Sequence, residues 1–220
     1  MVSKSKSGVA AENVLLRKFP NQPIGPAVER AEGAYLVLED GTQLLDANAG
    51  GSSFAVLGFS HPDVLEAMRA QMTRYCHVDF NSWANPLTEE LAALILSRAP
   101  EGLSRVYFAG GSGSEAVEAA MKLSYQVHHD NGRPERTWTI SRNQSYHGAT
   151  LGSLMASELN NLGFYEPLLP VNHARIEQHH PLYYRRDDES LDDYARRSAQ
   201  ELEDKILEIG ADKVSAFIGE

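Results

Sequence analysis

The stretch Phe108-Ala-Gly-Gly-Ser-Gly-Ser-Glu-Ala116 decides the fold, because its glycines join a strand pattern to a helical pattern. Apolar strand patterns occupy residues 105–108, 137–141 and 214–218, and helical patterns lie between them. Strands that alternate with helices are typical of a parallel sheet with helical crossovers. We therefore predict an α/β fold with a parallel-rich central sheet and flanking helices.

The same loop is a candidate phosphate site. Its glycines let the backbone approach a ligand closely, and the helix behind it presents unpaired N–H groups and a positive dipole end. Ser112 and Glu115 also have the spacing of a capping box, so a well-capped helix without a ligand is the alternative. Further along, Glu118 and Lys122 have i,i+4 spacing, and we interpret both as structural.

A nicotinamide enzyme is a second alternative for this loop. The spacing Gly111-x-Gly113-x-x-Ala116 matches the loose dinucleotide-binding fingerprint. That fingerprint expects an acidic residue at the end of the next strand, to hold a ribose hydroxyl. Here Ile140-Ser141 runs into Arg142-Asn143 instead, which weakens the nicotinamide interpretation.

A second loop, Gln144-Ser-Tyr-His-Gly-Ala-Thr-Leu-Gly152, follows the next strand and opens on the same edge of the sheet. Tyr146 in this loop can lay a flat ring over a planar heteroaromatic ligand, an arrangement that dispersion and ring quadrupoles favour. A phosphate cradle beside such a ring suggests pyridoxal phosphate as the ligand.

The first part of the chain predicts a hairpin and two helices. Asp40-Gly41 suits the tight turn of a β-hairpin within residues 35–45. Ser60-His61-Pro62 opens one helix, with Ser60 as the expected cap, and Asn85-Pro86 opens another. Apolar residues recur at helical spacing in both, so we expect both helices to face a core.

The last part of the chain predicts a short helix over 149–156, an irregular stretch over 159–186 and a long amphipathic helix from Leu191. The acidic residues 187–189 are expected in the first turn of the long helix, and Gly210 is expected to end it.

Composition and charge exclude several classes of protein. Thirty acidic and 20 basic residues give a net charge of −10, which repels nucleic-acid phosphates. No stretch approaches the ~20 apolar residues of a bilayer span, and the N-terminus lacks the apolar segment of a secretory signal. The single cysteine, Cys76, fits a reducing cytoplasm. The pairs His128-His129 and His179-His180 lack further ligands at metal-binding spacing, so we expect no metal site.

With these motifs in order, the chain resembles the N-terminal portion of the class III (omega) aminotransferases, fold type I enzymes that depend on pyridoxal 5'-phosphate. Gly113-Ser-Glu-Ala116 with Glu118 is similar to the phosphate loop of that family, and Tyr146-His-Gly148 is similar to its ring-stacking motif. Residues 202–220 resemble the omega-amine and amine–pyruvate branch.

The resemblance implies a role for each motif residue. Ser112, Gly113 and Ser114 would bind the cofactor phosphate, and Tyr146, with His147 beside it, would stack on the pyridine ring. Glu220 would lie near the cofactor. The family's Schiff-base lysine and the aspartate that pairs with the pyridine nitrogen are expected beyond residue 220, so no catalytic residue is expected within this chain.

The resemblance also implies a division of the chain. Residues 1–58 would form an N-terminal segment with the hairpin, part of a small domain and of the substrate-pocket loop. Residues 59–220 would form an incomplete cofactor-binding large domain, truncated before its end. The whole protein is expected to be a homodimer or higher homo-oligomer, with Ser53, Phe54, Phe80 and Trp83 as candidates for the substrate pocket.

The activity implied is the transfer of an amino group between an amine or omega-amino acid and a 2-oxo acid such as pyruvate. The 220-residue chain alone is expected to be inactive. A non-catalytic truncated chain that keeps only a binding or dimer surface is therefore a third alternative, beside the nicotinamide oxidoreductase.

Overall fold

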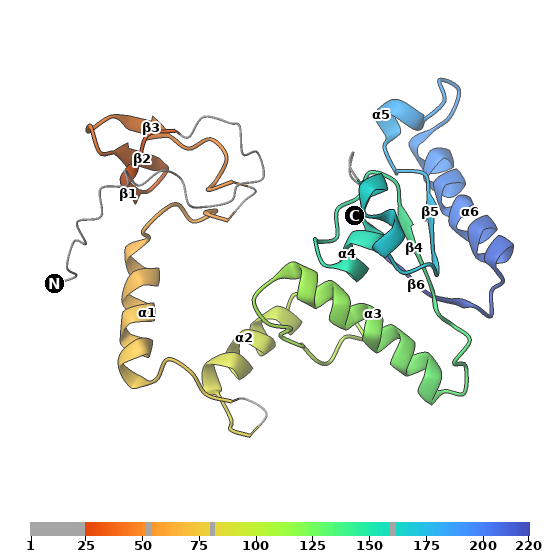
Figure 1. Ribbon diagram of the computed structural model, residues 1–220, viewed down its shortest axis with the longest axis horizontal. Coiled ribbons are helices and arrows are strands. Elements are labelled where there is room, and N and C mark those ends of the chain that lie inside the picture. Colours follow the sequence, from red (N-terminus) through yellow and green to blue (C-terminus); the bar gives the residue numbers. More distant parts are fainter. Residues whose placement is uncertain (1–24, 52–53, 80–81, 159–161) are drawn as a thin grey trace. The chain divides into compact units, whose positions relative to one another are not determined.

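The computed structural model describes residues 25–51, 54–79, 82–158 and 162–220 (Figure 1). The chain divides into two compact units, one ending at Glu89 and one running over Glu90–Glu220. Helix α2 (Pro86–Leu96) crosses this division.

The first unit contains a three-stranded antiparallel sheet in the order β1 (Val28–Glu32), β2 (Tyr35–Leu38), β3 (Gln43–Leu45). The predicted hairpin is confirmed, since Gly41 has a φ of +83° and Leu38 N donates to Thr42 O at 2.9 Å. Strand β1 was not expected. It pairs with β2, whose Val37 and Leu38 are buried.

Helix α1 (Pro62–Arg74) begins as predicted, but its expected cap is wrong. The N-cap is His61, whereas Ser60 has a φ of +55° and its hydroxyl donates to Ala31 O at 2.8 Å. The left-handed backbone turns the Ser60 side chain towards the hairpin sheet and away from the helix amides. Neither α1 nor α2 contains a buried residue, so the core contacts expected for both helices are not formed in the described part of the chain.

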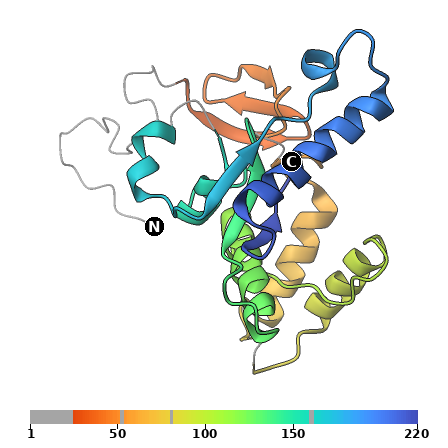
Figure 2. The same ribbon diagram turned by 90° about the vertical axis from the view of Figure 1, so that its right-hand side faces the viewer.

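The second unit contains a parallel sheet in the order β5 (His173–Ile176), β4 (Trp138–Arg142), β6 (Val214–Phe217). Thr139 lies opposite His173 on one side of β4, and Trp138 lies opposite Val214 on the other side. Helix α6 (Leu191–Ile209) covers one face of this sheet, and helices α3 (Gly113–Asp130) and α4 (Leu151–Ala156) lie on the other (Figures 1 and 2). The parallel α/β fold is confirmed.

Two details of this sheet differ from the prediction. Residues 105–108 form no regular strand. Both edges of β4 are already occupied, and no described strand pairs with 105–108 at the outer edges of β5 or β6. Conversely, β5 lies inside the stretch that we expected to be irregular, which also contains the short helix α5 (Pro181–Tyr184) and two 3₁₀ turns, Leu162–Phe164 and Glu166–Leu168.

The core of the second unit includes a hydrophobic cluster between the sheet and α6. Ile140, Ile176 and Val214 are buried, one from each strand, and the partly buried residues packed against them are Trp138, Ala174, Leu202, Ile206 and Ile209. The apolar face of α6 is therefore confirmed, as is its end at Gly210, whose φ is +105°. The acidic residues 187–189 precede the helix instead of forming its first turn, because Ser190 is the N-cap and accepts from Asp193 N.

Among the described residues, no helix is long and apolar enough to cross a membrane.

The completely buried Ile140 gives a test of this core. Ile140→Ala in the 220-residue chain should lower the free energy of unfolding by about 2–5 kcal/mol, because the cavity forms where β4, β5 and β6 meet. Urea titration followed by circular dichroism measures the change. Leu207→Ala, at a residue of α6 that is 64% exposed, is the control and should change stability by less than about 0.5 kcal/mol. Equal effects of the two substitutions would show that the core is misassigned.

Candidate functional site

The carboxyl ends of parallel strands lie at one edge of a sheet, where α/β folds place their ligands. Strand β4 ends at Arg142 and leads into the loop with Tyr146 and His147, and β6 ends at Phe217 and leads to Glu220. Tyr146 N donates to Glu220 Oε2 at 2.6 Å. Two of the predicted cofactor-binding positions, 74 residues apart in sequence, are therefore joined directly.

Ser112 caps the N-terminus of α3, but Glu115 binds the Gly111 amide instead of the Ser112 amide that a capping box would use. Ser112 Oγ accepts from Glu115 N at 3.3 Å and donates to Glu115 Oε2 at 3.0 Å. Glu115 Oε2 also accepts from Gly111 N at 2.9 Å. The amides of Gly113 and Ser114 lie in the first helical turn, which has no carbonyl to pair with them, and neither donates a hydrogen bond within the described residues. These two amides remain open to an anion.

The two predicted loops meet at Ser114. Ala149 N donates to Ser114 Oγ at 3.0 Å. Gly148 is buried with a φ of +138°, and a Cβ atom there would lie 2.6 Å from Ser114 Oγ and 2.5 Å from Ser153 Oγ. Only glycine fits at this position without displacing hydroxyls that are already hydrogen-bonded. The loop that carries Tyr146 is thus packed against the start of α3.

His147, next to Tyr146 in the loop, is partly buried. Its backbone N donates to Ser157 Oγ at 2.8 Å, and its Nε2 is buried without a hydrogen-bond partner in the described part of the chain. Burial lowers the pKa of His147, and the nearby Glu220 carboxylate partly offsets this shift. The Tyr146 side chain is 54% exposed, so its ring is accessible from outside.

Glu118 does not make the contact suggested by its spacing. No ion pair with Lys122 is formed among the described residues. Instead Glu118 Oε1 accepts from Gly152 N at 2.9 Å and from Thr150 Oγ1 at 2.7 Å. The i,i+4 spacing was thus a misleading signal, because a contact 32 residues away takes the carboxylate.

The predicted substrate-pocket residues belong to the first unit. Phe54 and Trp83 are 86% and 68% exposed, and Ser53 and Phe80 lie outside the described residues. Their role in a substrate pocket stays a prediction.

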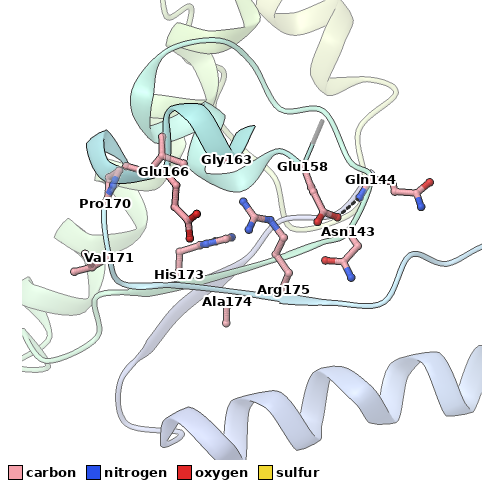
Figure 3. Close-up of a pocket in the computed structure, with 11 residues that line it drawn as sticks. Asn143, Gln144, Glu158, Gly163, Glu166, Pro170, Val171, His173, Ala174 and Arg175 are labelled. Carbon is pink, nitrogen blue, oxygen red and sulfur yellow. Dashed lines mark hydrogen bonds between the residues drawn. The ribbon is translucent and has the colours of Figure 1, made fainter. Parts of the chain in front are cut away.

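A separate hollow of about 880 Å³ contains none of the predicted site residues (Figure 3). In Figure 3 the Arg175 side chain lies between the carboxylates of Glu158 and Glu166. Arg175 Nη2 donates to Met155 O at 2.7 Å and to Ser157 O at 2.8 Å, and Glu158 Oε2 accepts from Gln144 N at 3.0 Å. These charged groups already bind the backbone, which indicates a structural role.

His173, in the same hollow, is the histidine whose pKa shifts most. Burial lowers its pKa to about 4, and the positive charge of Arg175 contributes further. Its Nε2 lies 3.3 Å from Ser141 Oγ on the neighbouring strand. The His173 imidazole is therefore neutral and contacts Ser141 where β5 pairs with β4.

The histidine pairs also have structural surroundings. His128 Nε2 lies 3.0 Å from Ser215 O, and the His179 ring stacks on Tyr194 with centroids 4.8 Å apart. No group of three or more His, Cys, Asp or Glu side chains suited to a metal ion occurs in the part of the chain that the structure describes.

Comparison with known proteins connects this geometry to a family. The family model for class-III aminotransferases matches residues 19–220. An uncharacterized aminotransferase of Schizosaccharomyces pombe is 38% identical over 210 residues, and the putrescine–pyruvate aminotransferase of Pseudomonas aeruginosa is 34% identical over 195 residues. These alignments cover 95% and 88% of this chain, but only 45% and 42% of the two relatives.

Solved transaminase structures are also similar to this chain. The omega transaminase of Pseudomonas jessenii in complex with PMP has a TM-score of 0.80 at 32% identity. A PLP-bound aminotransferase mutant of Vibrio fluvialis has a TM-score of 0.77 at 29% identity. The matches cover 89% and 88% of this chain, and 43% and 42% of those chains. The chain thus has the fold of PLP fold type I transaminases and spans less than half the length of the relatives it matches.

The buried His173 makes stability depend on pH. The unfolded chain takes up a proton near pH 6.5, but the folded chain takes it up only near pH 4, so this contribution to stability is complete above pH 6.5 and is lost as the pH falls towards 4. Urea unfolding of the 220-residue chain at several pH values between 7 and 4 measures the slope. His173→Gln should remove part of that slope. Identical slopes for the variant and the original chain would contradict the assignment.

Proposed function

The chain belongs to the class-III aminotransferases, and on that premise we propose that it forms the N-terminal part of a pyridoxal phosphate site. The whole protein would transfer an amino group between an amine or omega-amino acid and a 2-oxo acid such as pyruvate. The observation that carries this proposal is the convergence of two contacts: Ala149 N with Ser114 Oγ, and Tyr146 N with Glu220 Oε2. Together they bring an anion-binding helix end, an aromatic ring and a carboxylate to one edge of the sheet.

The residues present fit the proposed cofactor. The open amides of Gly113 and Ser114 and the hydroxyl proton of Ser114 are donors suited to a phosphate at a helix N-terminus. Ser112 would contribute its backbone, because its hydroxyl is bonded to Glu115. The exposed face of Tyr146 would stack on the pyridine ring, with His147 and Glu220 beside it.

Bound pyridoxal phosphate would supply an electron-withdrawing ring that stabilises negative charge at a carbon losing a proton. The contribution of this chain would be to orient that ring. The phosphate donors would hold one end and Tyr146 one face, while the Tyr146 amide holds the Glu220 carboxylate in a fixed direction. Burial lowers the pKa of His147 and so favours the neutral imidazole beside the ring.

The nicotinamide alternative has no support in this geometry. Strand β4 ends at Arg142 and is followed by Asn143, so its end offers no carboxylate for a ribose. The family assignment points in the same direction.

Substrate and assembly follow as further parts of the proposal. The similarity to a putrescine–pyruvate aminotransferase supports an amine donor and pyruvate as acceptor. The exposed apolar residues of α1 and α2, among them Met68, Leu91 and Leu94, support a homodimer whose pocket would include Ser53, Phe54, Phe80 and Trp83. The division into residues 1–58 and 59–220 and a cytoplasmic location remain sequence-based proposals.

Cofactor binding by the family-length protein that carries this chain tests the site. Addition of pyridoxal phosphate should give a visible absorption band that remains after gel filtration, and its absence would contradict the proposed function. Tyr146→Ala should weaken cofactor binding about tenfold through lost stacking, whereas Tyr146→Phe keeps the ring and should bind normally. Ser114→Ala should weaken binding at least about tenfold, because it removes a hydrogen bond to a charged phosphate. Unchanged affinity in both alanine variants would remove the site assignment.

The 220-residue chain alone should show no transaminase turnover. Lys122 lies eight residues beyond Ser114 along α3, about 12 Å away. Lys205 Nζ is bonded to Glu208, and Lys213 precedes β6, at the edge of the sheet opposite to Glu220. Lys4, Lys6 and Lys18 lie outside the described residues. Sustained alanine formation from putrescine and pyruvate by the purified chain with pyridoxal phosphate would refute this prediction.

A further inference from the structure

Two elements would supply the proposed cofactor site. The phosphate donors are at the start of α3, and the ring-stacking Tyr146 is on the loop between β4 and α4. A cofactor held at both ends requires a fixed separation between these elements. The hydrogen bonds that set this separation determine whether ring and phosphate can be bound together.

Among the described residues, Glu118 of α3 is suited to that task. We propose that Glu118 is a positioning residue that holds the Tyr146 loop at a fixed place against α3, an inference that rests on the proposed function. Its Oε1 accepts from Gly152 N at 2.9 Å and from Thr150 Oγ1 at 2.7 Å. Both donors lie at the start of α4, immediately after the loop.

Glu118 acts together with Ser114. The two residues are four apart on α3 and therefore project from one face of the helix, one turn apart. Ser114 Oγ holds Ala149 N, and Glu118 Oε1 holds Gly152 N three residues further on. Two anchors in register along α3 fix both the distance and the direction of the segment 149–152.

Glycines on the loop side match these anchors. A Cβ atom on Gly152 would lie 2.6 Å from Glu118 Oε2 and 2.8 Å from Glu118 Oε1. The absence of a side chain at Gly152, as at Gly148, lets the backbone come within hydrogen-bond distance of α3. Helices α3 and α4 are thus joined by backbone-to-side-chain hydrogen bonds, which tolerate less displacement than apolar contacts do.

Apolar burial on the α3 side of this contact is limited. Helix α3 contains no buried residue, and Leu151, next to the anchored Gly152, is half exposed. Removal of the Glu118 carboxylate therefore leaves Ser114 as the remaining side-chain anchor among those described between α3 and this segment. The helix itself should persist, because alanine is the best helix former.

Glu118→Ala in the family-length protein tests the inference. Pyridoxal phosphate should bind about tenfold more weakly, the loss expected for one charge-assisted hydrogen bond, and the visible circular dichroism of the bound cofactor should decrease. The affinity of the apoprotein for inorganic phosphate, measured by competition with the cofactor, should not change, because the phosphate donors stay in place. Pyridoxal, which lacks the phosphate, should lose as much affinity as pyridoxal phosphate.

Three further variants separate positioning from general destabilisation. Glu118→Gln keeps an oxygen acceptor without its charge and should restore most of the affinity and of the dichroism. Thr150→Val removes one of the two donors and should give a smaller loss in the same direction. Lys122→Ala, one turn further along α3, is the matched control and should leave all four measurements unchanged.

The outcomes distinguish this inference from the proposed function. If the unmodified protein binds no pyridoxal phosphate, the proposed function fails and the inference fails with it. If the unmodified protein binds the cofactor and Glu118→Ala binds it equally well, only the positioning role is overturned. Equal losses of affinity for inorganic phosphate and for the cofactor would also overturn it, because Glu118 would then act on the phosphate donors.

Discussion

The pairing of β4 on both sides is the constraint on which the second unit depends. Parallel hydrogen bonding to β5 and β6 makes β4 the centre of the sheet, and Ile140 on it is completely buried. The chain must therefore leave β4 at the edge where β6 also ends. Loops from distant parts of the sequence meet there because the sheet brings them to the same edge, and the Tyr146 to Glu220 contact is the direct result.

Hydrogen bonds attach α3 to β6 and to the start of α4. The Ser124 and Ser215 hydroxyls lie 2.7 Å apart, and His128 Nε2 lies 3.0 Å from Ser215 O, so one half of the helix is tied to β6. At its other end Ser114 and Glu118 tie the helix to the start of α4. Hydrogen bonds require specific distances and angles, whereas apolar contacts tolerate sliding. A helix whose first turn is proposed to hold a phosphate is thus fixed by directional contacts at both ends.

The features that sequence predicted well are those set by local chemistry. The Asp40-Gly41 turn, the Ser112 cap of α3 and the end of α6 at Gly210 each depend on a few adjacent residues, and all three are present. The predictions were wrong where the contact of a residue is determined by a partner distant in the sequence. Glu118 bonds to α4 instead of Lys122, Ser60 turns to Ala31, and residues 105–108 have a strand pattern without a described strand beside them. Strand β5 was missed because its four residues, His173-Ala-Arg-Ile176, alternate in a way too short and too polar to indicate a strand.

The hydrogen bonds at the start of α3 show that a capped helix and a phosphate site can occur together in this loop. The sequence pattern is compatible with a capped helix or with a phosphate cradle, which would be exclusive alternatives only if the cap used up the available donors. The first turn of a helix has several unpaired amides, and an N-cap side chain satisfies only some of them. Here Glu115 takes the Gly111 amide and the Ser112 hydroxyl, and the cap itself orders the turn that presents the amides of Gly113 and Ser114. The two interpretations are therefore compatible, and the cap would prepare the proposed anion site by fixing the direction of the remaining donors before a ligand arrives.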